Sequence, residues 1–336
     1  MEKVRLNKKK CQQGLDGMNL EFSFGVADME NLYLPQEELK NKAGNTIVRL
    51  DCIGGKVRAY VNAIHCIRPN NVKPFGVADA IKLELVKGRV TDFIQKYLQK
   101  HLKGRYSGEV IQNMTVKALE VNITIPCVGG ATPSDVISLL DLALDKTTIH
   151  RKRRWQTRYE KVNTGCLFSK AKEYRLKIYD KTEEQHQKGN PLVEKNLLRI
   201  EVVFIDRSLR RMFGERRGLL DVLSVQAIET MCWEYKQVLE QDIINGSVKP
   251  CLKNCVAQLL KSLQSAETGH EISAAIAQCK ELIPDIEVLR KALKRWYEWR
   301  GIKDISKQII CHYRKRNFRF PEGVIKTIKV FHDAAG

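Results

Sequence analysis

Apolar and polar residues alternate in several separate segments of the chain, which is the pattern of half-buried β-strands. A hairpin is expected over residues 46–64, where two alternating runs flank the turn pair Gly54-Gly55. A third alternating run, IKLELV, covers residues 81–86. The spacing of the apolar residues then changes to that of a helix over residues 90–102.

Three further strands are expected in the middle of the chain, and each has apolar residues on one face and reactive residue types on the other. These runs are TVKALEVNITI (115–125), EYRLKIY (173–179) and LLRIEVVFI (197–205). If they lie side by side in one sheet, Glu120, Tyr179 and Glu201 converge on one surface. Any half-exposed antiparallel sheet has a polar outer face, so the pattern by itself does not establish a site.

Helices are expected after the first of these strands and throughout the last third of the chain. Thr132 and Pro133 are typical of the first two positions of a helix start. From about Leu219 onward the apolar spacing is helical. The expected fold class is therefore α+β, an antiparallel sheet with an α-helical C-terminal region. We expect three parts: a polar, partly mobile N-terminal segment (1–45), an α+β domain (46–220) and a helical accessory domain (221–336).

The charge of the chain favours a polyanionic partner. It has 58 Lys and Arg against 39 Asp and Glu, a formal net charge of +19, and neutralising phosphates releases condensed counterions. Charge alone leaves DNA, RNA and anionic membrane surfaces open. No apolar run approaches the roughly 20 residues that cross a bilayer, and the first residues lack the pattern of a signal peptide. We therefore expect a cytoplasmic protein with no membrane partner.

Basic residues are concentrated in three places. The first cluster is Arg151, Lys152, Arg153, Arg154 and Trp155. Its aromatic residue among arginines is typical of surfaces that bind single-stranded DNA. The second cluster comprises Arg207, Arg210, Arg211, Arg216 and Arg217. The third spans residues 289–320 and is expected to dock duplex DNA through a helix. Each cluster taken singly is also what a solvated face looks like.

The segment YRLKIYDKTEEQHQ (174–187), followed by LLRIEVVFIDRSLRRMFG (197–214), resembles the gene II replication protein family of filamentous phages. In that family a strand ends in a nucleophilic Tyr with a Lys two residues later, and a helix start rich in Glu, Gln and His follows. An Arg-x-Glu strand then leads into a basic helix that ends in Phe-Gly. ALEVNI (118–123) is similar to the family's acidic strand, with Glu120 where Asp is usual. The resemblance covers about residues 80–225 and extends to plasmid and integrative-element initiators.

The resemblance implies that Tyr179 is the nucleophile. Attack by its oxygen on a phosphodiester conserves the bond energy and gives a 5′-phosphotyrosine and a free 3′-hydroxyl. A phenol with a pKa near 10 needs a base or a nearby cation to react at neutral pH. Lys181 is expected to neutralise a phosphate oxygen or to lower the pKa of the tyrosine. His186 or Glu184 is expected to position a metal ion or to transfer a proton.

A metal-dependent reaction is also implied. Glu120 and Glu201 are the expected ligands of Mg²⁺ or Mn²⁺, with Asn122 as a third on the same strand face. Related nickases carry a His-hydrophobe-His metal motif, and no His-x-His occurs in this chain, so a carboxylate site is the consistent alternative. DNA contacts are expected from Arg175, Lys177 and Arg199 as well as from the first two basic clusters. In the competing interpretation, Glu120 and Glu201 are surface carboxylates that pair with Lys177 and Arg175, and Tyr179 is a packing aromatic.

These observations predict a rolling-circle replication initiator, a site-specific single-strand DNA endonuclease and ligase that acts on single-stranded and origin DNA. The chain has no Walker-type phosphate loop, so a host helicase and a host DNA polymerase are expected partners. Three alternatives remain open: a conjugative or transposon relaxase with the same chemistry, a DNA-binding regulator without catalysis, and an RNA-binding structural protein.

Overall fold

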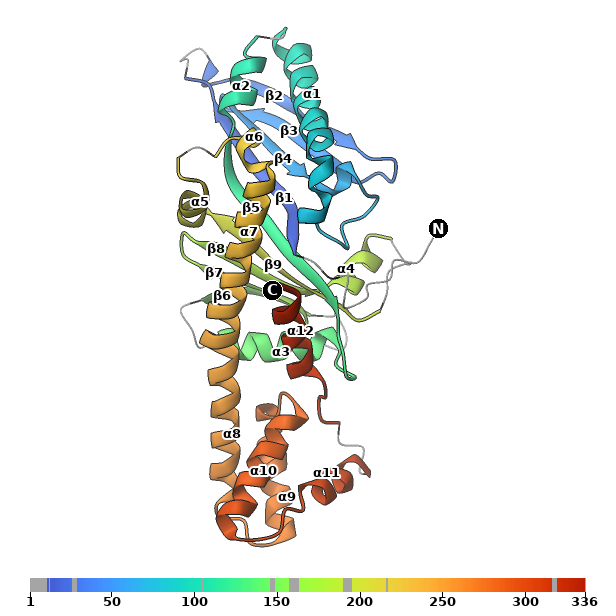
Figure 1. The fold of residues 1–336 in the computed structure, drawn as a ribbon, viewed down its shortest axis with the longest axis vertical. Helices are drawn as coiled ribbons and strands as arrows, with labels where there is room; N and C mark the ends of the chain where they lie inside the picture. The colour runs from blue at the N-terminus through green and yellow to red at the C-terminus, as the bar shows by residue number, and fades with distance from the viewer. Residues whose placement is uncertain are drawn as a thin grey trace.

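The computed structural model describes residues 11, 13–25, 29–103, 105–145, 149–156, 163–189, 195–215, 217–315 and 319–335. Its centre is a nine-stranded sheet in the order β2-β3-β4-β1-β5-β9-β8-β7-β6 (Figure 1). All neighbouring strands pair antiparallel, so the expected α+β class with an antiparallel sheet is confirmed. The strands are β1 Gly14–Ser23, β2 Tyr33–Lys40, β3 Thr46–Ile53, β4 Lys56–Asn62, β5 Thr115–Pro126, β6 His150–Gln156, β7 Asn163–Lys170, β8 Tyr174–Asp180 and β9 Leu197–Ile205.

The expected hairpin and the three central strands are present. β3 and β4 are joined at Gly54 and Gly55, both of which have positive φ and suit a tight hairpin turn. β5, β9 and β8 lie side by side in the sheet, the arrangement that the convergence of Glu120, Tyr179 and Glu201 requires.

Two strands, β1 and β2, lie within the first 45 residues, where the sequence predicted no strand. β1 is inserted between β4 and β5 in the middle of the sheet, and β2 forms one edge. Met18, Leu20 and Phe22 are buried at alternate positions of β1, so the strand contributes directly to the core. Residues 1–10 lie outside the described part of the chain. The sheet therefore begins before residue 46, at which the sequence placed the start of the α+β domain.

Two other segments differ from the expectation. Residues 81–86 are helical, because the 3-10 helix η4 (Val77–Lys82) leads into α1 (Leu83–Leu102). Leu83, Val86 and Val90 are buried at helical spacing while Ile81 is 90% exposed, so burial of the helical face overrides the local alternation. The basic segment RKRRW is also not a connection. It belongs to β6, the edge strand beside β7.

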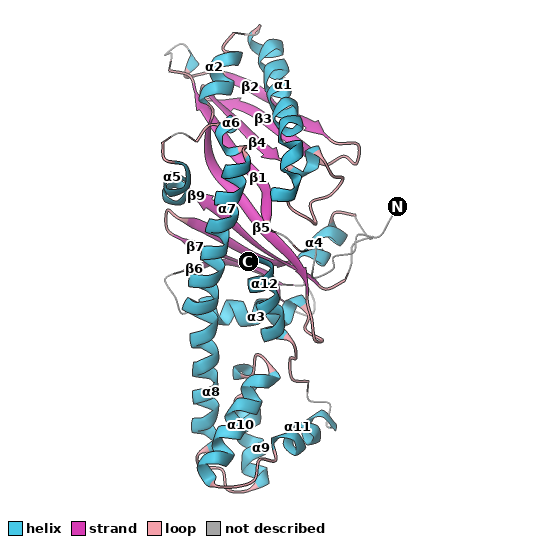
Figure 2. Ribbon diagram, in the orientation of Figure 1, coloured by secondary structure: helices cyan, strands magenta, loops and turns pink. Residues whose placement is uncertain are grey.

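Most of the helices cover one face of the sheet, and those near the C-terminus extend beyond it (Figures 1 and 2). Their bounds are η3 Ile64–Cys66, α2 Ser107–Asn113, α3 Pro133–Leu144, α4 Lys181–Gln187, α5 Asp206–Phe213, α6 Leu219–Val222, α7 Val225–Gln237, η5 Val238–Val248, α8 Lys249–Leu263, α9 Gly269–Gln278, η6 Lys280–Leu282, α10 Ile286–Arg300, α11 Ser306–Lys315 and α12 Val324–Ala335. α7 packs on β1 and β5, and α12 packs on β5 and α3. The Tyr235 hydroxyl donates to the carbonyl of Ile200 at 2.8 Å, which fixes α7 to β9.

One long helix connects the sheet to a helical lobe. α7 continues through the π-helical segment η5 into α8 without a break (Figure 1). α9 and α10 pack against α8, and the indole of Trp296 donates to the carbonyl of Leu263 at 2.7 Å. The C-terminal third of the chain thus has two structural roles. Most of its helices form a separate lobe, while α7 and α12 pack on the sheet. Among the helices in the described ranges, none has both the length and the apolar character needed to cross a bilayer.

Candidate active site

A cavity of about 500 Å³ lies on the face of the sheet opposite α7 and α12, where β4, β5, β8 and β9 present polar side chains. It is acidic although the chain as a whole is strongly basic. Its carboxylates are Asp16, Glu120, Asp180, Glu183, Glu184 and Glu201, and its lysines are Lys177 and Lys188. Such a concentration of negative charge attracts cations and is costly to maintain without a function.

Tyr179, Glu201 and Lys177 form the centre of this cavity. The Tyr179 hydroxyl donates a hydrogen bond to Glu201 Oε2 at 3.2 Å. Lys177 forms an ion pair with Glu201 Oε1 and lies 3.8 Å from Glu120 Oε1. The pairing with Lys177 that the competing interpretation expects is therefore present, but Glu201 is 3% exposed and is not a surface carboxylate. Arg175 is exposed on the same strand.

The strand register explains why these side chains meet. Asn122 of β5 lies opposite Glu201 of β9, and Glu201 lies opposite Lys177 of β8. Tyr179 lies opposite Arg199. Since alternate residues of a strand point to one face, all of these side chains lie on the same face of three adjacent strands.

A second tyrosine reaches the same cavity from β4. The Tyr60 hydroxyl donates to Glu120 Oε2 at 3.5 Å, across the intervening strand β1. Gly17 of β1 makes this possible. A Cβ atom at that position would lie 2.7 Å from the Tyr60 hydroxyl and 2.9 Å from Glu120 Oε2.

The electrostatics of the cavity favour the protonated form of Glu120. Burial, and then the charge of Glu201, raises the pKa of Glu120 to about 7, although Lys177 opposes the shift. Burial disfavours the charged form of Lys177, but Glu201 and Glu120 outweigh it and raise the pKa of the ammonium group. Burial also raises the pKa of Tyr179 well above its ordinary value, and Arg199 offsets only part of this. A phenol in this environment reacts only if a neighbouring group accepts its proton.

Three oxygen donors of the type that a hard divalent cation binds lie on one face of β5 and β9. Glu120 and Glu201 both line the cavity, and the charge of Glu201 contributes to the raised pKa of Glu120. The Asn122 Oδ1 atom is buried and has no hydrogen-bond partner among the described residues, while its Nδ2 donates to Asp16 at 3.0 Å. Within the described part of the chain, no group of three or more His, Cys, Asp or Glu side chains has the spacing of a metal site. Binding of a divalent cation in this cavity would therefore depend on Glu120 and Glu201 together with the amide oxygen of Asn122.

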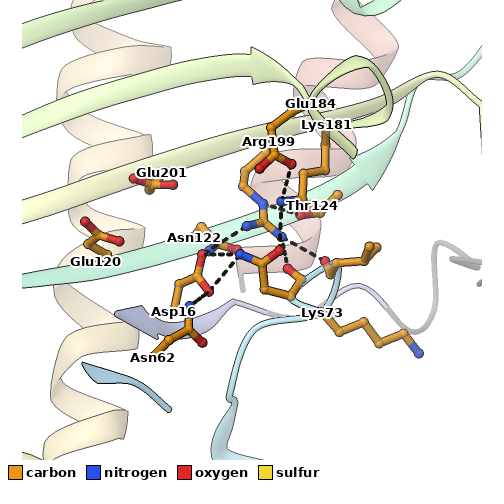
Figure 3. Close-up of polar contacts among 12 residues, drawn as sticks. Asp16, Asn62, Lys73, Glu120, Asn122, Thr124, Lys181, Glu184, Arg199 and Glu201 are labelled. Atoms are coloured by element: carbon orange, nitrogen blue, oxygen red, sulfur yellow. Dashed lines mark hydrogen bonds and ion pairs between the residues drawn. The ribbon is translucent and has the colours of Figure 1, made fainter. Parts of the chain in front are cut away.

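Arg199 holds the floor of the cavity together (Figure 3). It is fully buried, pairs with Asp16 Oδ2 at 3.0 Å and donates to the Thr124 hydroxyl at 2.8 Å. Asp16 also accepts hydrogen bonds from Asn62, Asn71 and Asn122. The expectation that Arg199 contacts DNA is wrong. Its guanidinium group binds Asp16 and Thr124 and has no access to solvent.

Lys181 is buried beside the nucleophile candidate and not in the cavity itself. Its Nζ donates to Asn71 Oδ1 at 2.9 Å and pairs with Glu184 Oε2 at 2.7 Å, and it lies 5.9 Å from the centre of the Tyr179 ring. Burial and then Arg199 lower the pKa of Lys181 to about 7. Burial favours the neutral acid at Glu184, but Lys181, Lys188 and Gln185 outweigh it and hold the pKa of Glu184 at about 2.

This shift predicts a pH-dependent stability. The pKa of Glu184 is lower in the folded chain than the ordinary 4.5, so its contribution is present above pH 4.5 and is lost as the pH falls toward 2. We expect Glu184→Gln to lower the free energy of unfolding by about 1–3 kcal/mol at pH 7 and by progressively less below pH 4.5. Urea unfolding at a series of pH values measures this.

The matched control is Lys188→Met. Lys188 is the other ion-pair partner of Glu184, and its side chain is 62% exposed. An exposed ion pair contributes about 0–1 kcal/mol, so this variant is expected to have the smaller effect at pH 7. An effect of Glu184→Gln that is constant from pH 7 to pH 3 would contradict the assignment of this ion pair.

The other expected DNA-binding residues fall into two groups. Near the cavity, Trp155 lines its edge, the Arg153 guanidinium lies 5.6 Å from the Trp155 ring, and Lys152 is exposed. Arg151 and Arg154 both pair with Asp141 of α3.

Arg216 lies outside the described residues, and the other arginines of the second cluster do not line the cavity. Arg211 pairs with Glu234 of α7 at 2.7 Å, on the side of the sheet that the helices cover. Arg207 and Arg210 are exposed on α5, near Glu173 and Asp206 respectively. His186 is exposed on α4 and is also absent from the lining of the cavity, so the geometry gives it no role in proton transfer there.

The main residues that the sequence did not indicate are Asp16, Gly17, Tyr60 and Asn71. One signal was available for β1, the alternation of the apolar residues Met18, Leu20 and Phe22. Tyr60 lies in a strand that was expected, but nothing local distinguishes it from a packing aromatic.

No protein-family model matches the chain, and neither does any curated protein.

Proposed function

We propose that the chain is a nicking enzyme that attacks one DNA strand with Tyr179, and that it initiates rolling-circle replication. The observation that carries the proposal is the hydrogen bond from the Tyr179 hydroxyl to the buried carboxylate of Glu201, in a cavity open to substrate. The resemblance to the gene II replication proteins supports the choice of DNA as substrate and of replication as the process.

The chemistry assigns one task to each residue. Glu201 Oε2 accepts the phenolic proton as the Tyr179 oxygen attacks phosphorus. The bond from phosphorus to the 3′ oxygen breaks, which leaves a 5′-phosphotyrosine and a 3′-hydroxyl. Lys177 holds Glu201 in place through its other carboxylate oxygen. Reversal of the same steps rejoins the strand.

A divalent cation fits beside this pair. Glu120, Glu201 and the Asn122 Oδ1 atom would hold Mg²⁺ or Mn²⁺, which would polarise the scissile phosphate when bound. The chain's own contribution is to orient these oxygens, through the register of β5 and β9 and through Asp16, which accepts a hydrogen bond from the Asn122 amide nitrogen.

The surroundings of the cavity support a single-stranded substrate. Trp155 packs on Gly165, which lies opposite Tyr179 in the sheet, so an aromatic ring stands next to the nucleophile. A base adjacent to the scissile phosphate can stack on that ring, while Lys152 and Arg153 follow the backbone.

Covalent trapping tests the proposed function. The protein is incubated with labelled single-stranded DNA of its own replicon, with Mn²⁺ or with EDTA, and the products are separated on denaturing gels. We expect a metal-dependent adduct whose linked peptide contains Tyr179 when mapped by mass spectrometry. DNA binding without an adduct on either strand would favour the non-catalytic regulator instead.

A separate basic hollow supports duplex binding by the helical lobe. A hollow of about 240 Å³ between α8 and α10 is lined by four cations and no carboxylate. These cations are Lys249, Lys253, Lys291 and Arg295.

Simultaneous replacement of Lys253 and Lys291 by alanine is expected to weaken binding to origin duplex. It should also reduce the slope of log affinity against log salt concentration by about 2, because each lysine that contacts a phosphate contributes about 0.9. Titrations between low and moderate salt measure the slope. The control is Lys82→Ala, an exposed lysine directly before α1. Equal slopes for the double variant and the control would exclude this hollow from the DNA contact.

A further inference from the structure

We infer that a hollow at one end of the sheet binds a nucleoside 5′-phosphate, with the phosphate held by Lys42 and Arg89 and the base placed beside His65. The hollow is separate from the cavity that contains Tyr179 and Glu201, and the inference does not depend on the proposed function.

The hollow lies where the turn between β2 and β3 meets η3 and the first half of α1. Its volume is about 510 Å³, within the range of about 300–1,000 Å³ that small ligands occupy. Among the residues that the structure describes, it shares none with the lining of the cavity around Tyr179. It is lined by four cations, one carboxylate and a group of apolar side chains. This mixture suits a ligand with a charged end and an apolar ring.

Two of the cations carry a charge that no carboxylate of the described residues neutralises. Arg68, Lys40 and Asp92 each have an ion-pair partner outside the hollow. Lys42 and Arg89 form no such pair in the part of the chain that the structure describes. A phosphate monoester carries a charge of about −1.5 to −2 at pH 7. It therefore matches these two cations better than the single charge of a phosphodiester inside a DNA strand does.

Arg89 is fixed in position by the backbone. Its Nη1 atom donates to the carbonyl of Cys66, the last residue of η3, at 2.7 Å. A carbonyl orients a guanidinium group without neutralising it, so the other N–H groups keep their charge for a ligand. Charge-assisted hydrogen bonds from arginine to phosphate are among the strongest in proteins. Lys42, which is exposed in the turn between β2 and β3, supplies the second charge.

His65 gives the hollow a hydrogen-bond acceptor. Its Nδ1 atom lies 2.9 Å from the carbonyl of Thr46, and because a carbonyl only accepts, Nδ1 carries the proton. Burial lowers the pKa of the ring, so the ring is neutral at pH 7 and its Nε2 atom accepts. The donor that Nε2 needs is an exocyclic amino group, which adenine and cytosine carry and thymine lacks. The buried side chains of Ile47 and Cys66 supply apolar surface for the face of such a base.

One short segment contributes to both sites. Residues 65–69 line the hollow, and Asn71 lines the cavity. The backbone N–H of His65 donates to Asn62 Oδ1 at 3.2 Å, and the amide of Asn62 donates to Asp16 at 3.4 Å (Figure 3). A ligand beside His65 therefore contacts the same segment that supports Asp16 on the floor of the cavity.

Calorimetric titration of the full chain in EDTA tests the inference. We expect adenosine 5′-monophosphate to bind, and Lys42→Ala and Arg89→Gln each to raise its dissociation constant by about 10–100-fold, because each removes a hydrogen bond to a charged group. Lys42 is exposed in a turn, so its variant keeps the fold even if Arg89→Gln does not. The matched control is Lys82→Ala, which removes an exposed lysine directly before α1 and is expected to leave the constant unchanged.

Inosine 5′-monophosphate tests the contact with the base. It has an oxygen in place of the amino group of adenosine and is otherwise the same molecule, so no protein variant is needed. We expect it to bind at least about tenfold more weakly, because the Nε2 atom of His65 then lacks a donor. Inorganic phosphate, which has no base, is expected to bind more weakly than adenosine monophosphate as well.

Two sources supply this ligand chemistry, a free nucleotide and the 5′-phosphorylated end of a DNA strand. Two oligonucleotides that begin with deoxyadenosine separate them, one with a 5′-phosphate and one with a 5′-hydroxyl. A preference for the phosphorylated strand that is lost in Lys42→Ala would support the strand end as the ligand. Binding of adenosine monophosphate without such a preference would support the free nucleotide.

The inference is overturned if neither adenosine monophosphate nor the 5′-phosphate binds in a manner that depends on Lys42. It is also overturned if the adenosine and inosine nucleotides bind equally. These measurements need neither a metal ion nor cleavage of DNA. A failure of Tyr179 to form an adduct would therefore refute the proposed function and leave this inference standing.

Discussion

Replacement of Tyr179 by phenylalanine is expected to reduce the covalent adduct by at least about 1000-fold, because the variant lacks the phenolic oxygen that attacks phosphorus. The substitution removes one oxygen and leaves the ring in place. Glu201 keeps its ion pair with Lys177, so the carboxylate does not become a buried charge without a partner. Denaturing gels of protein incubated with labelled DNA and Mn²⁺ measure the effect.

The matched control removes a hydroxyl from the same strand. Tyr174→Phe loses a hydrogen bond to Asp242 on the opposite face of β8, so the adduct should form with a modest cost in stability of about 1–3 kcal/mol. Thermal unfolding shows whether both variants are folded at the assay temperature. An adduct of undiminished yield in Tyr179→Phe would mean that another residue is the nucleophile in the first step.

Arg199→Met is expected to lower the free energy of unfolding by about 3–5 kcal/mol. Removing one partner of a buried ion pair leaves the other charge without compensation, and Asp16 is 3% exposed. The hydrogen bonds to Thr124 and to the carbonyl of Val72 are lost as well. Urea unfolding followed by circular dichroism measures the change.

Two further variants test whether the loss of stability in Arg199→Met comes from the broken ion pair or from the change in side-chain size. Arg207→Met removes an arginine that is mostly exposed and is expected to change stability by less than about 0.5 kcal/mol. The double variant Arg199→Met with Asp16→Asn should cost less than the sum of its two single variants, because the two residues interact directly. An effect of Arg199→Met below about 1 kcal/mol would show that the network contributes little to stability.

Much of the sheet could be predicted from the sequence because its strands obey a local rule. β3, β4, β5, β8 and β9 alternate apolar and polar residues, and Gly54 and Gly55 mark the hairpin. The juxtaposition of Glu120, Tyr179 and Glu201 followed from that alternation together with the assumption that the three strands are neighbours. The sheet order confirms the assumption.

The rest depended on distant contacts that no local pattern encodes. Arg199 has the same alternation as Glu201, and only the position of Asp16, 183 residues away along the chain, makes it an internal ion-pair partner and not a DNA contact. Residues 81–86 alternate like a strand, but burial of Leu83 and Val86 makes them helical. Lys177 was expected to bind DNA, and its position between two carboxylates became evident only from the pairing of β8 with β9.

The central position of β1 has a consequence for how the chain is made. β1 pairs with β4 on one side and with β5 on the other, and Asp16 needs Arg199 as its partner. A ribosome adds about 5–20 residues per second, so β1 emerges many seconds before β9. Until β5 emerges, β1 to β4 can form a half-sheet whose open edge is β1, and Asp16 lacks its ion-pair partner until β9 follows. The nascent chain therefore passes through a state with an exposed strand edge, and such edges promote pairing with other chains.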